Sequence, residues 1–588
     1  MTAKVVTLQV SAGIQRDGTV FSSPSYTDGK WVRFQYARPK KIGGYTGVFL
    51  NATDISRGMI MSADNGLNYV ISGYSAGVEQ WITDNDNGVG SGPVQFTTSG
   101  FTSNANNLWQ FDIGYDALGN AQNNLIAHPG QNLSDITSTV NTRPLFGLFT
   151  GTTLSPVGVF TAVGTTTSGS PTVTFATTVV SIGAGLTVTG TGIPANTTVL
   201  SALTVGGVWT VTLDKNATAS GTVTLTFDNN ISVSGGIVML FPYLFAYGNN
   251  GYIANCAAGD FSNWTSADSN KNNISSTKVV KGLPLRGGTS SPAGLFWTLD
   301  SVVRVTYAPQ TVGSSTLYWR YDLITQQSSI MSSQCVIEYD GIFYWCGTDR
   351  FLMYNGVVQE VENNQNFNYF FDNLNYAQRQ KVWVSKIPRY GEIWWFFPSG
   401  DSTECNDAVI YNTRDKVWYD AGQAIGARRS AGVFSEVFRR PIWGGVESNG
   451  SGKYTLWQHE TGVNEVYTNR VNAIDSFFET NVIGPRMGLV GATEQPGDNV
   501  WTRLERIEPD FVQVNEMSVV VTGNGYADEE PQPSDPYVFN PDTLKIDMKE
   551  QRREMRLRFR SNVQNGNYFM GRVLLSMDTG DVRGTGNP

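Results

Sequence analysis

Short segments in which apolar and polar residues alternate recur along the chain, whereas long stripes with helical spacing do not. Alternation with a period of two places every second side chain on the same face of a strand. The clearest segments are VRFQY (32–36), LNYVISGY (67–74), IFYWCG (342–347), EIWWFF (392–397) and MRLRFR (555–560). They have the length of ordinary strands and end at Gly, Asn, Asp or Pro. The pattern predicts an all-β chain with one short helix near Phe371 to Lys381.

Several of these strands form a loose repeat, in which an aromatic strand, a turn and a second strand ending at Trp or Tyr follow one another. Residues 341–357 and 391–420 show it most clearly, and 440–462, 67–82 and 243–256 are weaker copies. Irregular repeats of about 40 to 50 residues with antiparallel strands are typical of propeller blades. The repeat predicts a β-propeller-like body.

Two changes in composition interrupt the repeat. Pro144 to Leu213 contains no charged residue, and its alternating Thr and Val residues favour strands with one apolar and one hydroxyl face. Thr493 to Asn499 has the composition of a linker. We therefore expect four parts: 1–154, the N-terminal part of the propeller body; 155–228, an inserted small β-sandwich module; 229–495, the remainder of the body; and 496–588, a C-terminal β domain or closing blade with an extended arm.

The composition excludes several classes of protein. Hydrophobic residues make up 40% of the 588 residues and charged residues 15%, against about 25% in an average domain, so the chain is not disordered. The net charge of −9 argues against a dedicated nucleic-acid binder, which needs a positive face. The four cysteines lack the spacing of zinc or disulfide frameworks, which predicts buried thiols in a reducing compartment. No segment approaches the ~18 apolar residues of a membrane span.

Catalytic chemistry has little support in the sequence. The only histidines, His128 and His459, are expected at the surface or in turns. No nucleophile elbow, zinc-protease motif or phosphate-binding loop is present. We therefore expect no enzyme, no cofactor and no metal site. The remaining alternative is glycoside chemistry by a pair of the 50 acidic residues.

The segment RREMRLRFR (552–560) predicts a strand with two different faces. Met555, Leu557 and Phe559 share one face, and Arg556, Arg558 and Arg560 share the other. A row of arginines suits the carboxylates of a neighbouring protein or phosphates. Because the chain is acidic, we favour a protein contact over DNA. The candidates for a subunit interface or a DNA channel are Arg552, Arg553, Arg556, Arg558 and Arg560.

The segment GKWVRFQYARPKKIGGY (29–45) interleaves basic and aromatic residues, as some nucleic-acid patches do. The spacing instead favours a structural hairpin: a strand, a turn begun around Pro39, and a strand ended by Gly43 and Gly44. Val32, Phe34 and Tyr36 would then enter a core, with Arg33 on the opposite, exposed face. The motif residues are Trp31, Arg33, Phe34, Pro39, Lys41, Gly43 and Gly44.

This hairpin, W-V-R-F followed by R-P-x-K-I-G-G-Y, resembles the start of propeller-type tail proteins of short-tailed bacteriophages, the tail-tube nozzle and packaged-DNA-stabilising family. The resemblance continues at residues 336–358, and the Thr- and Gly-rich module is similar to sandwich modules of phage structural proteins. It implies a hexameric tube below the portal that retains packaged DNA and conducts it during ejection. The chain would be assembled in the host cytoplasm and reside in the virion tail.

The same resemblance implies the partners: further copies of this chain, the portal-adaptor ring protein, tail fibre or spike proteins, and double-stranded DNA in transit, contacted without sequence specificity. Two alternatives remain open. One is a glycan-binding or glycan-degrading β-propeller on the virion or secreted, and the other is a structural propeller with no viral role.

Overall fold

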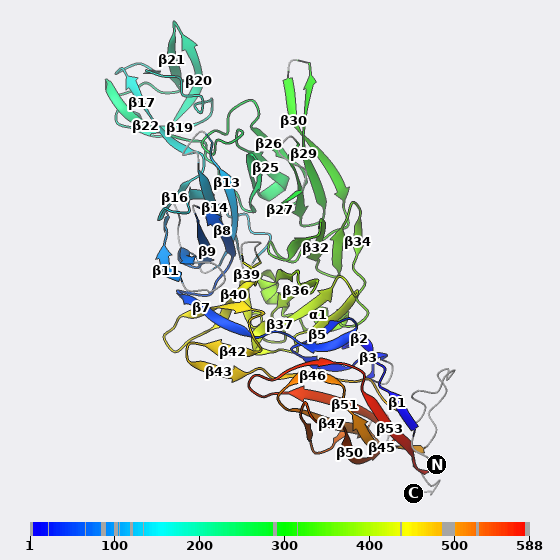
Figure 1. Cartoon of the computed structure of the whole chain (residues 1–588). Helices are drawn as coiled ribbons and strands as arrows, with labels where there is room; N and C mark the ends of the chain where they lie inside the picture. Colours follow the sequence, from blue (N-terminus) through cyan, green and yellow to red (C-terminus); the bar gives the residue numbers. More distant parts are fainter. Residues whose placement is uncertain are drawn as a thin grey trace. The chain divides into compact units, whose positions relative to one another are not determined.

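Strands account for nearly all the regular structure, which confirms the all-β, propeller-like fold (Figure 1). The computed structural model describes residues 4–582 except 21–22, 65, 84–89, 99–100, 102–103, 105, 118–121, 133–134, 286–290, 314, 435–437, 485–499 and 525–528. The chain forms two compact units: the internal unit, Phe49–Glu360, and the terminal unit, Met1–Val48 with Val361–Pro588. The predicted linker at Thr493 to Asn499 lies outside the described residues.

Four sheets of the internal unit are antiparallel meanders of four strands, the order found in propeller blades. A fifth sheet adds β12 in parallel beside β16. The predicted repeats at 67–82, 243–256 and 341–357 fall on the neighbouring pairs β9–β10, β24–β25 and β32–β33. The strands are β8 (Met59–Asp64), β9 (Leu67–Tyr74), β10 (Gly77–Thr83), β11 (Gly90–Gln95), β12 (Thr97–Thr98), β13 (Asn107–Tyr115), β14 (Asn123–Asn132), β15 (Leu145–Leu148), β16 (Thr153–Pro156), β23 (Gly236–Leu240), β24 (Tyr243–Tyr247), β25 (Tyr252–Asn255), β26 (Asn270–Asn273), β27 (Val279–Leu285), β28 (Ala293–Thr298), β29 (Val302–Val312), β30 (Ser315–Thr325), β31 (Val336–Tyr339), β32 (Ile342–Cys346), β33 (Phe351–Tyr354) and β34 (Val358–Glu360).

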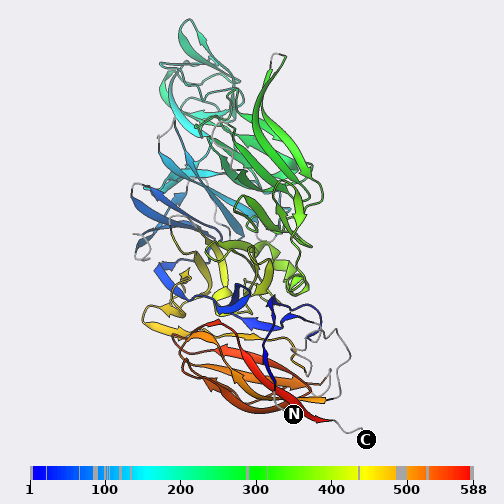
Figure 2. The same cartoon turned by 45° about the vertical axis from the view of Figure 1, so that its right-hand side comes forward.

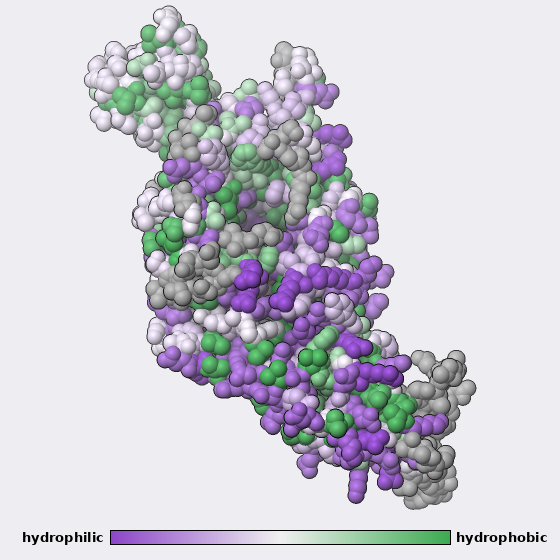
Figure 3. Space-filling view, viewed as in Figure 1, coloured by the Kyte–Doolittle hydropathy of each residue, from purple (hydrophilic) through white to green (hydrophobic). Residues whose placement is uncertain are grey.

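The inserted module is a closed six-stranded barrel. The alternation of its sequence is visible in β22, where Leu225 and Phe227 are buried and the neighbouring Thr224 and Thr226 are more exposed. Figure 3 shows mainly pale and green residues over the barrel, as expected for a segment with few charges. The strands are β17 (Val159–Thr166), β18 (Thr172–Phe175), β19 (Thr187–Gly190), β20 (Thr197–Val205), β21 (Val208–Leu213) and β22 (Gly221–Asp228).

The terminal unit contains one four-stranded meander and one six-stranded sheet of order β39-β40-β41-β7-β42-β43. The repeats at 391–420 and 440–462 fall on β36–β38 and β40–β41. The predicted helix is present but starts earlier, as α1 (Phe367–Asn373) followed by the 3-10 helix η4 (Tyr376–Lys381). The strands are β35 (Trp383–Ile387), β36 (Glu392–Phe397), β37 (Asp407–Asn412), β38 (Val417–Asp420), β39 (Arg429–Val433), β40 (Ile442–Ser448), β41 (Tyr454–His459), β7 (Tyr45–Ala52), β42 (Asn464–Tyr467) and β43 (Arg470–Ala473).

Apart from the β2-β3 pair, the remaining sheets of the terminal unit combine strands from both ends of the chain. β1 lies beside β53 in Figures 1 and 2, and β6 pairs with β52. The sheet orders are β1-β53-β45-β50, β4-β44-β51-β47-β48 with β49 beside β47, β46-β52-β6-β5, and β2-β3. The strands are β1 (Lys4–Thr7), β2 (Ser11–Ile14), β3 (Ser25–Tyr26), β4 (Asp28–Lys30), β5 (Val32–Gln35), β6 (Arg38–Lys41), β44 (Ser476–Glu479), β45 (Val500–Glu508), β46 (Phe511–Val514), β47 (Met517–Asn524), β48 (Gln532–Pro533), β49 (Tyr537–Phe539), β50 (Ile546–Arg552), β51 (Glu554–Ser561), β52 (Asn567–Met570) and β53 (Leu574–Val582).

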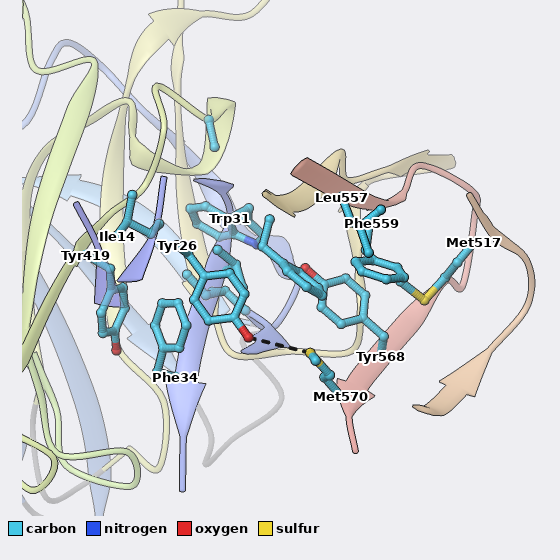
Figure 4. Close-up of a cluster of buried hydrophobic side chains, with 14 of the residues drawn as sticks. Ile14, Tyr26, Trp31, Phe34, Tyr419, Met517, Leu557, Phe559, Tyr568 and Met570 are labelled. Atoms are coloured by element: carbon cyan, nitrogen blue, oxygen red, sulfur yellow. Dashed lines mark hydrogen bonds between the residues drawn. The ribbon is translucent and has the colours of Figure 1, made fainter. Parts of the chain in front are cut away.

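One aromatic core joins these strands (Figure 4). The ring of Phe34 lies 5.2 Å from that of Tyr26 and 5.4 Å from that of Tyr419, and the Tyr26 hydroxyl lies 3.6 Å from the sulfur of Met570. N-terminal residues therefore pack between the β35–β38 sheet and the C-terminal strands.

The N-terminal hairpin differs from the predicted one in its turn. β5 and β6 are joined by Tyr36 and Ala37, whose φ angles are +51° and +60°, so Pro39 lies within β6. Positive φ at both central residues matches the twist of a hairpin, although Asn and Gly usually occupy these positions. Tyr36 is consequently exposed and does not share the buried face of Val32 and Phe34.

No helix among the described residues is long and apolar enough to cross a membrane.

Candidate functional site

Arg33 of β5 is buried, so the expectation that it lies on an exposed face is wrong. Its guanidinium donates to Glu392 at 2.8 and 2.9 Å and to Glu460 at 2.6 and 2.9 Å. Its Cζ atom lies 3.7 Å from the ring centre of Tyr390. Burial lowers the pKa of Arg33, but the two carboxylates outweigh this effect and raise it above its ordinary value. Burial is tolerated because both carboxylates are hydrogen-bonded to the guanidinium.

The other hairpin residues are also used inside the protein. Trp31 is fully buried and donates from Nε1 to the carbonyl of Gly43 at 3.1 Å. Lys41 donates to the carbonyl of Gly566 at 2.9 Å, and burial lowers its pKa to about 8. A Cβ atom at Gly44 would lie 2.3 Å from the carbonyl oxygen of Asn464, so only glycine fits there. These contacts attach the hairpin to β42 and to the C-terminal strands.

The arginine row of β51 has the two faces that the sequence predicts. Met555, Leu557 and Phe559 are buried, and the arginines between them pair with carboxylates of the same chain. Arg556 and Arg558 both bind Glu479, at 2.7 and 2.8 Å; Arg558 also binds Asp28 at 3.0 Å, and Arg560 binds Asp475 at 2.7 Å. Arg552 ends β50, where it pairs with Glu550 at 3.3 Å, and Arg553 lies in the turn before β51. Contact of this row with another subunit or DNA stays a prediction.

Both histidines are buried, so their predicted place at the surface or in turns is wrong. His128 lies within β14, with Nε2 3.2 Å from the carbonyl of Val233, and burial lowers its pKa to about 4. His459 ends β41, and burial followed by the charge of Arg429 lowers its pKa. Packing explains both positions, because neutral imidazole tolerates burial far better than its cation does. The four cysteines are buried thiols outside any disulfide, as predicted.

Two buried carboxylates, Asp407 and Asp420, lie at the ends of β37 and β38. Asp407 accepts a hydrogen bond from the Tyr369 hydroxyl at 2.6 Å, and Asp420 pairs with Arg16 at 2.9 Å. Burial, followed by the charge of Asp420, raises the pKa of Asp407 to about 7. Because both side chains are fully buried, neither faces a substrate; Asp420 holds Arg16 of the N-terminal segment, and Asp407 also accepts from the backbone N–H of Gln423.

A cleft of about 330 Å³ opens on the six-stranded sheet of the terminal unit and is the candidate site. β42 and β43 pair Glu465 with Asn472 and Tyr467 with Arg470, and paired residues of antiparallel strands project from the same face. In neighbouring β7, a Cβ atom at Gly47 would lie 2.8 Å from the ring of Tyr467, so glycine leaves room for that ring. The other lining residues come from β39 to β41 and the loops beside them, and include Arg428, Arg429, Glu447, Asn449 and Trp457.

Arg429 is the buried cation of the cleft, with 2% of its surface exposed. Nε donates to neutral His459 at 3.0 Å, and Nη1 donates to the carbonyls of Arg428 and Ile425. Its Cζ atom lies 4.9 Å from the ring centre of Tyr45 and 5.2 Å from that of Trp457. No carboxylate of the described residues forms an ion pair with Arg429; burial lowers its pKa to about 10, against the opposing effect of Tyr45 and of the charges of Glu465 and Glu447.

Two buried donors of the cleft, Arg428 Nε and Arg429 Nη2, have no hydrogen-bond partner among the described residues. Glu465, which could neutralise Arg429, instead accepts from the Tyr45 hydroxyl at 2.8 Å and from Asn472 at 3.0 Å. Buried donors without partners are rare in folded proteins. Sequence reasoning missed this cleft because its residues come from five strands and carry no motif.

Comparisons with known proteins give no family. No family model matches the chain, and no curated protein does. Among solved structures, the chain is similar to the exo-β-1,3-galactanase of Phanerochaete chrysosporium with galactose, at 11% identity and a TM-score of 0.21, over 58% of this chain and 95% of that one. A variant of that enzyme with β-1,3-galactotriose matches at 9% identity and a TM-score of 0.25, over 91% of this chain and 99% of that one.

The expectation that the chain is not an enzyme is corrected by this finding, because these matched structures are those of an enzyme. That expectation is withdrawn. At TM-scores of 0.21 to 0.25, no reaction or substrate is transferred to this chain.

Proposed function

We propose that the chain is a structural subunit of a bacteriophage tail tube. Six copies would form a channel below the portal and adaptor, retain packaged DNA and conduct it during ejection. The observation that carries the proposal is the N-terminal hairpin, the most specific part of the resemblance. Its Trp31, Arg33 and Lys41 are buried in contacts with distant parts of the chain, which supports a structural role for the shared motif.

The charge of the chain supports the same function. A conduit must let DNA slide, and a wall that binds phosphates tightly would obstruct it. The net charge of −9, together with arginines of β51 that are already paired with carboxylates, favours weak repulsion. The expected partners are further copies of the chain, an adaptor ring, fibre or spike proteins, and double-stranded DNA in transit.

Electron microscopy of the purified protein, alone and mixed with the adaptor ring protein, tests this function. We expect end-on particles with six-fold symmetry and an open centre in at least one of the two samples. Single particles without rotational symmetry in both samples would contradict the proposal. Titration with double-stranded DNA is the companion measurement, and binding that is at most weak and independent of sequence is expected.

The cleft favours a second candidate function, a propeller that binds glycans. Trp457 and Tyr467 offer rings to the faces of a sugar, and Asn449 and Asn472 offer amides to its hydroxyl groups. Concave sites with aromatic walls and a few polar groups are typical of small-molecule binding. A saccharide array probed with the protein and with Trp457→Ala tests it: glycan binding that the variant loses supports this function, and an array without signal contradicts it.

A further inference from the structure

We propose that the cleft between β40 and β43 binds a sugar that carries one carboxylate, such as a uronic acid residue of an acidic polysaccharide. The inference deepens the second proposed function and rests on it. It starts from Arg429, a buried cation with neither a carboxylate partner among the described residues nor a hydrogen-bond acceptor for Nη2.

The charges that line the cleft match a singly charged ligand. Three arginines (Arg428, Arg429 and Arg470) face two glutamates (Glu447 and Glu465), so three minus two leaves one positive charge on a chain whose net charge is −9. One carboxylate would neutralise it. A phosphate monoester carries a charge of about −1.5 to −2 and would leave the cleft negative.

The arginines have different roles. Arg429 lies against the rings of Tyr45 and Trp457, so it acts through a fixed charge in a poorly solvated place. Arg470 is exposed and has no ion-pair partner among the described residues, so it can bind a ligand directly. Arg428 pairs with exposed Glu447 at 2.5 Å and can exchange that partner for a ligand carboxylate.

The uncharged side chains that line the cleft suit the neutral part of a sugar. Trp457 and Tyr467 are half-buried, so each presents an aromatic surface to the cleft. Asn449 donates to the Tyr467 hydroxyl at 3.3 Å, which orders an amide at the rim. Rings and amides recognise a sugar ring with hydroxyl groups, whereas a simple carboxylate would leave both unused.

The test is calorimetric titration of the full chain with glucuronate, glucose and glucose 6-phosphate. We expect glucuronate to bind about tenfold more tightly than glucose or more, because charge-assisted hydrogen bonds add to the shared sugar contacts. Binding of glucuronate should weaken as salt is added. Glucose 6-phosphate should bind more weakly than glucuronate.

Three variants locate the site. Arg470→Gln removes an exposed cation and should weaken glucuronate binding without changing glucose binding. Glu447→Gln removes a competing carboxylate and should strengthen glucuronate binding, whereas a glutamate that binds sugar hydroxyls would show the opposite. Arg429→Met should abolish the preference for glucuronate, and the two exposed variants keep the test valid if this buried variant does not fold.

The outcomes separate the two levels of the proposal. Equal binding of glucose and glucuronate would keep the glycan function and overturn the carboxylate. Tighter binding of glucose 6-phosphate would replace the carboxylate by a phosphate. No binding of any sugar would overturn both the inference and the glycan function, and leave the tail-tube proposal to its own test.

Discussion

Arg33 and Arg429 are two buried arginines of the terminal unit, and each lies against a tyrosine ring. They differ in the groups that compensate their charges. Arg33 forms ion pairs with two glutamates, whereas Arg429 forms none among the described residues and donates to neutral acceptors. The pKa moves accordingly, above its ordinary value for Arg33 and down to about 10 for Arg429.

The difference distinguishes Arg33, which holds distant strands together, from Arg429, which lines a cleft that can bind a ligand. A buried cation whose donors are all matched by carboxylates has no capacity left for a ligand. A buried cation without a counter-ion stays in an unfavourable state that an incoming anion relieves. The number of carboxylates around a buried arginine therefore indicates its role better than its burial does.

The largest effect is expected from Arg33→Met. The substitution leaves Glu392 and Glu460 without their partner, and breaking a buried ion pair lowers the free energy of unfolding by about 3–5 kcal/mol. Urea unfolding measures the loss. The matched control is Arg503→Met, an exposed arginine paired with Glu505 at 3.5 Å, for which a loss under about 1 kcal/mol is expected. Equal losses of unfolding free energy in the two variants would refute the stabilising role of Arg33.

Asp407→Asn tests a third way to bury an ionisable group. Asp407 avoids a buried charge by being protonated, whereas Arg33 keeps its charge and pairs it with carboxylates. The folded pKa of about 7 lies above the ordinary 3.8, so the folded state binds more protons between these values. The stabilisation by Asp407 is thus fully present below about pH 4 and is lost as the pH rises through 7, on the order of 1 kcal/mol per pH unit. We expect the difference in unfolding free energy between wild type and variant to shrink from pH 5 to pH 8. The buried histidines have the opposite pH dependence, but they are present in both wild type and variant, so their contribution cancels in the difference. A difference in unfolding free energy that stays constant from pH 5 to pH 8 would contradict the prediction.

Arg429→Met is expected to cost much less stability than Arg33→Met. Replacing an unpaired buried charge by a side chain of similar length is close to neutral, so we expect a loss of about 1 kcal/mol or none in urea unfolding. The pKa of His459 should rise, because the charge of Arg429 contributes to its depression. Titration of the imidazole by NMR measures that rise, and a loss as large as that of Arg33→Met would remove the contrast between the two arginines.

The smallest effect on stability is expected from Arg560→Glu. Arg560 is 47% exposed and pairs with Asp475 near the surface, so the loss should stay at about 1 kcal/mol or less. Its effect on assembly distinguishes the hypotheses for the arginine row. Failure to form rings, with unchanged unfolding, would support a subunit interface, whereas intact rings would remove that idea.

Local pattern was enough to predict much of the fold. The alternation in 555–560 places its buried and exposed residues correctly, and the aromatic repeats fall on neighbouring antiparallel strands. The turn at Tyr36 and Ala37 was missed because neither residue type signals positive φ. The predicted helix begins too late, although Phe367, Phe370, Phe371 and Leu374 follow the i, i+3, i+4, i+7 spacing of a helix.

The sites were less predictable because they depend on contacts between distant segments. The carboxylates that bury Arg33 lie 359 and 427 positions away along the chain, and no local pattern encodes that meeting. The same holds for the cleft, where Glu465 and Tyr467 form part of the wall only because β42 pairs with β7, which is distant in sequence. Burial of an arginine beside alternating apolar residues could have been suspected, but its partners could not.

The pairing of β1 with β53 has a consequence for the timing of folding. Lys4 lies opposite Met577, so this edge of the sheet cannot form until about 570 further residues have been synthesised. At about 5–20 residues per second, the first strand waits roughly half a minute to two minutes for its partner. The internal unit is continuous in sequence and can fold during that interval. The N-terminal strands are therefore made before the internal unit but completed after it, and they stay exposed to chaperones and proteases in between.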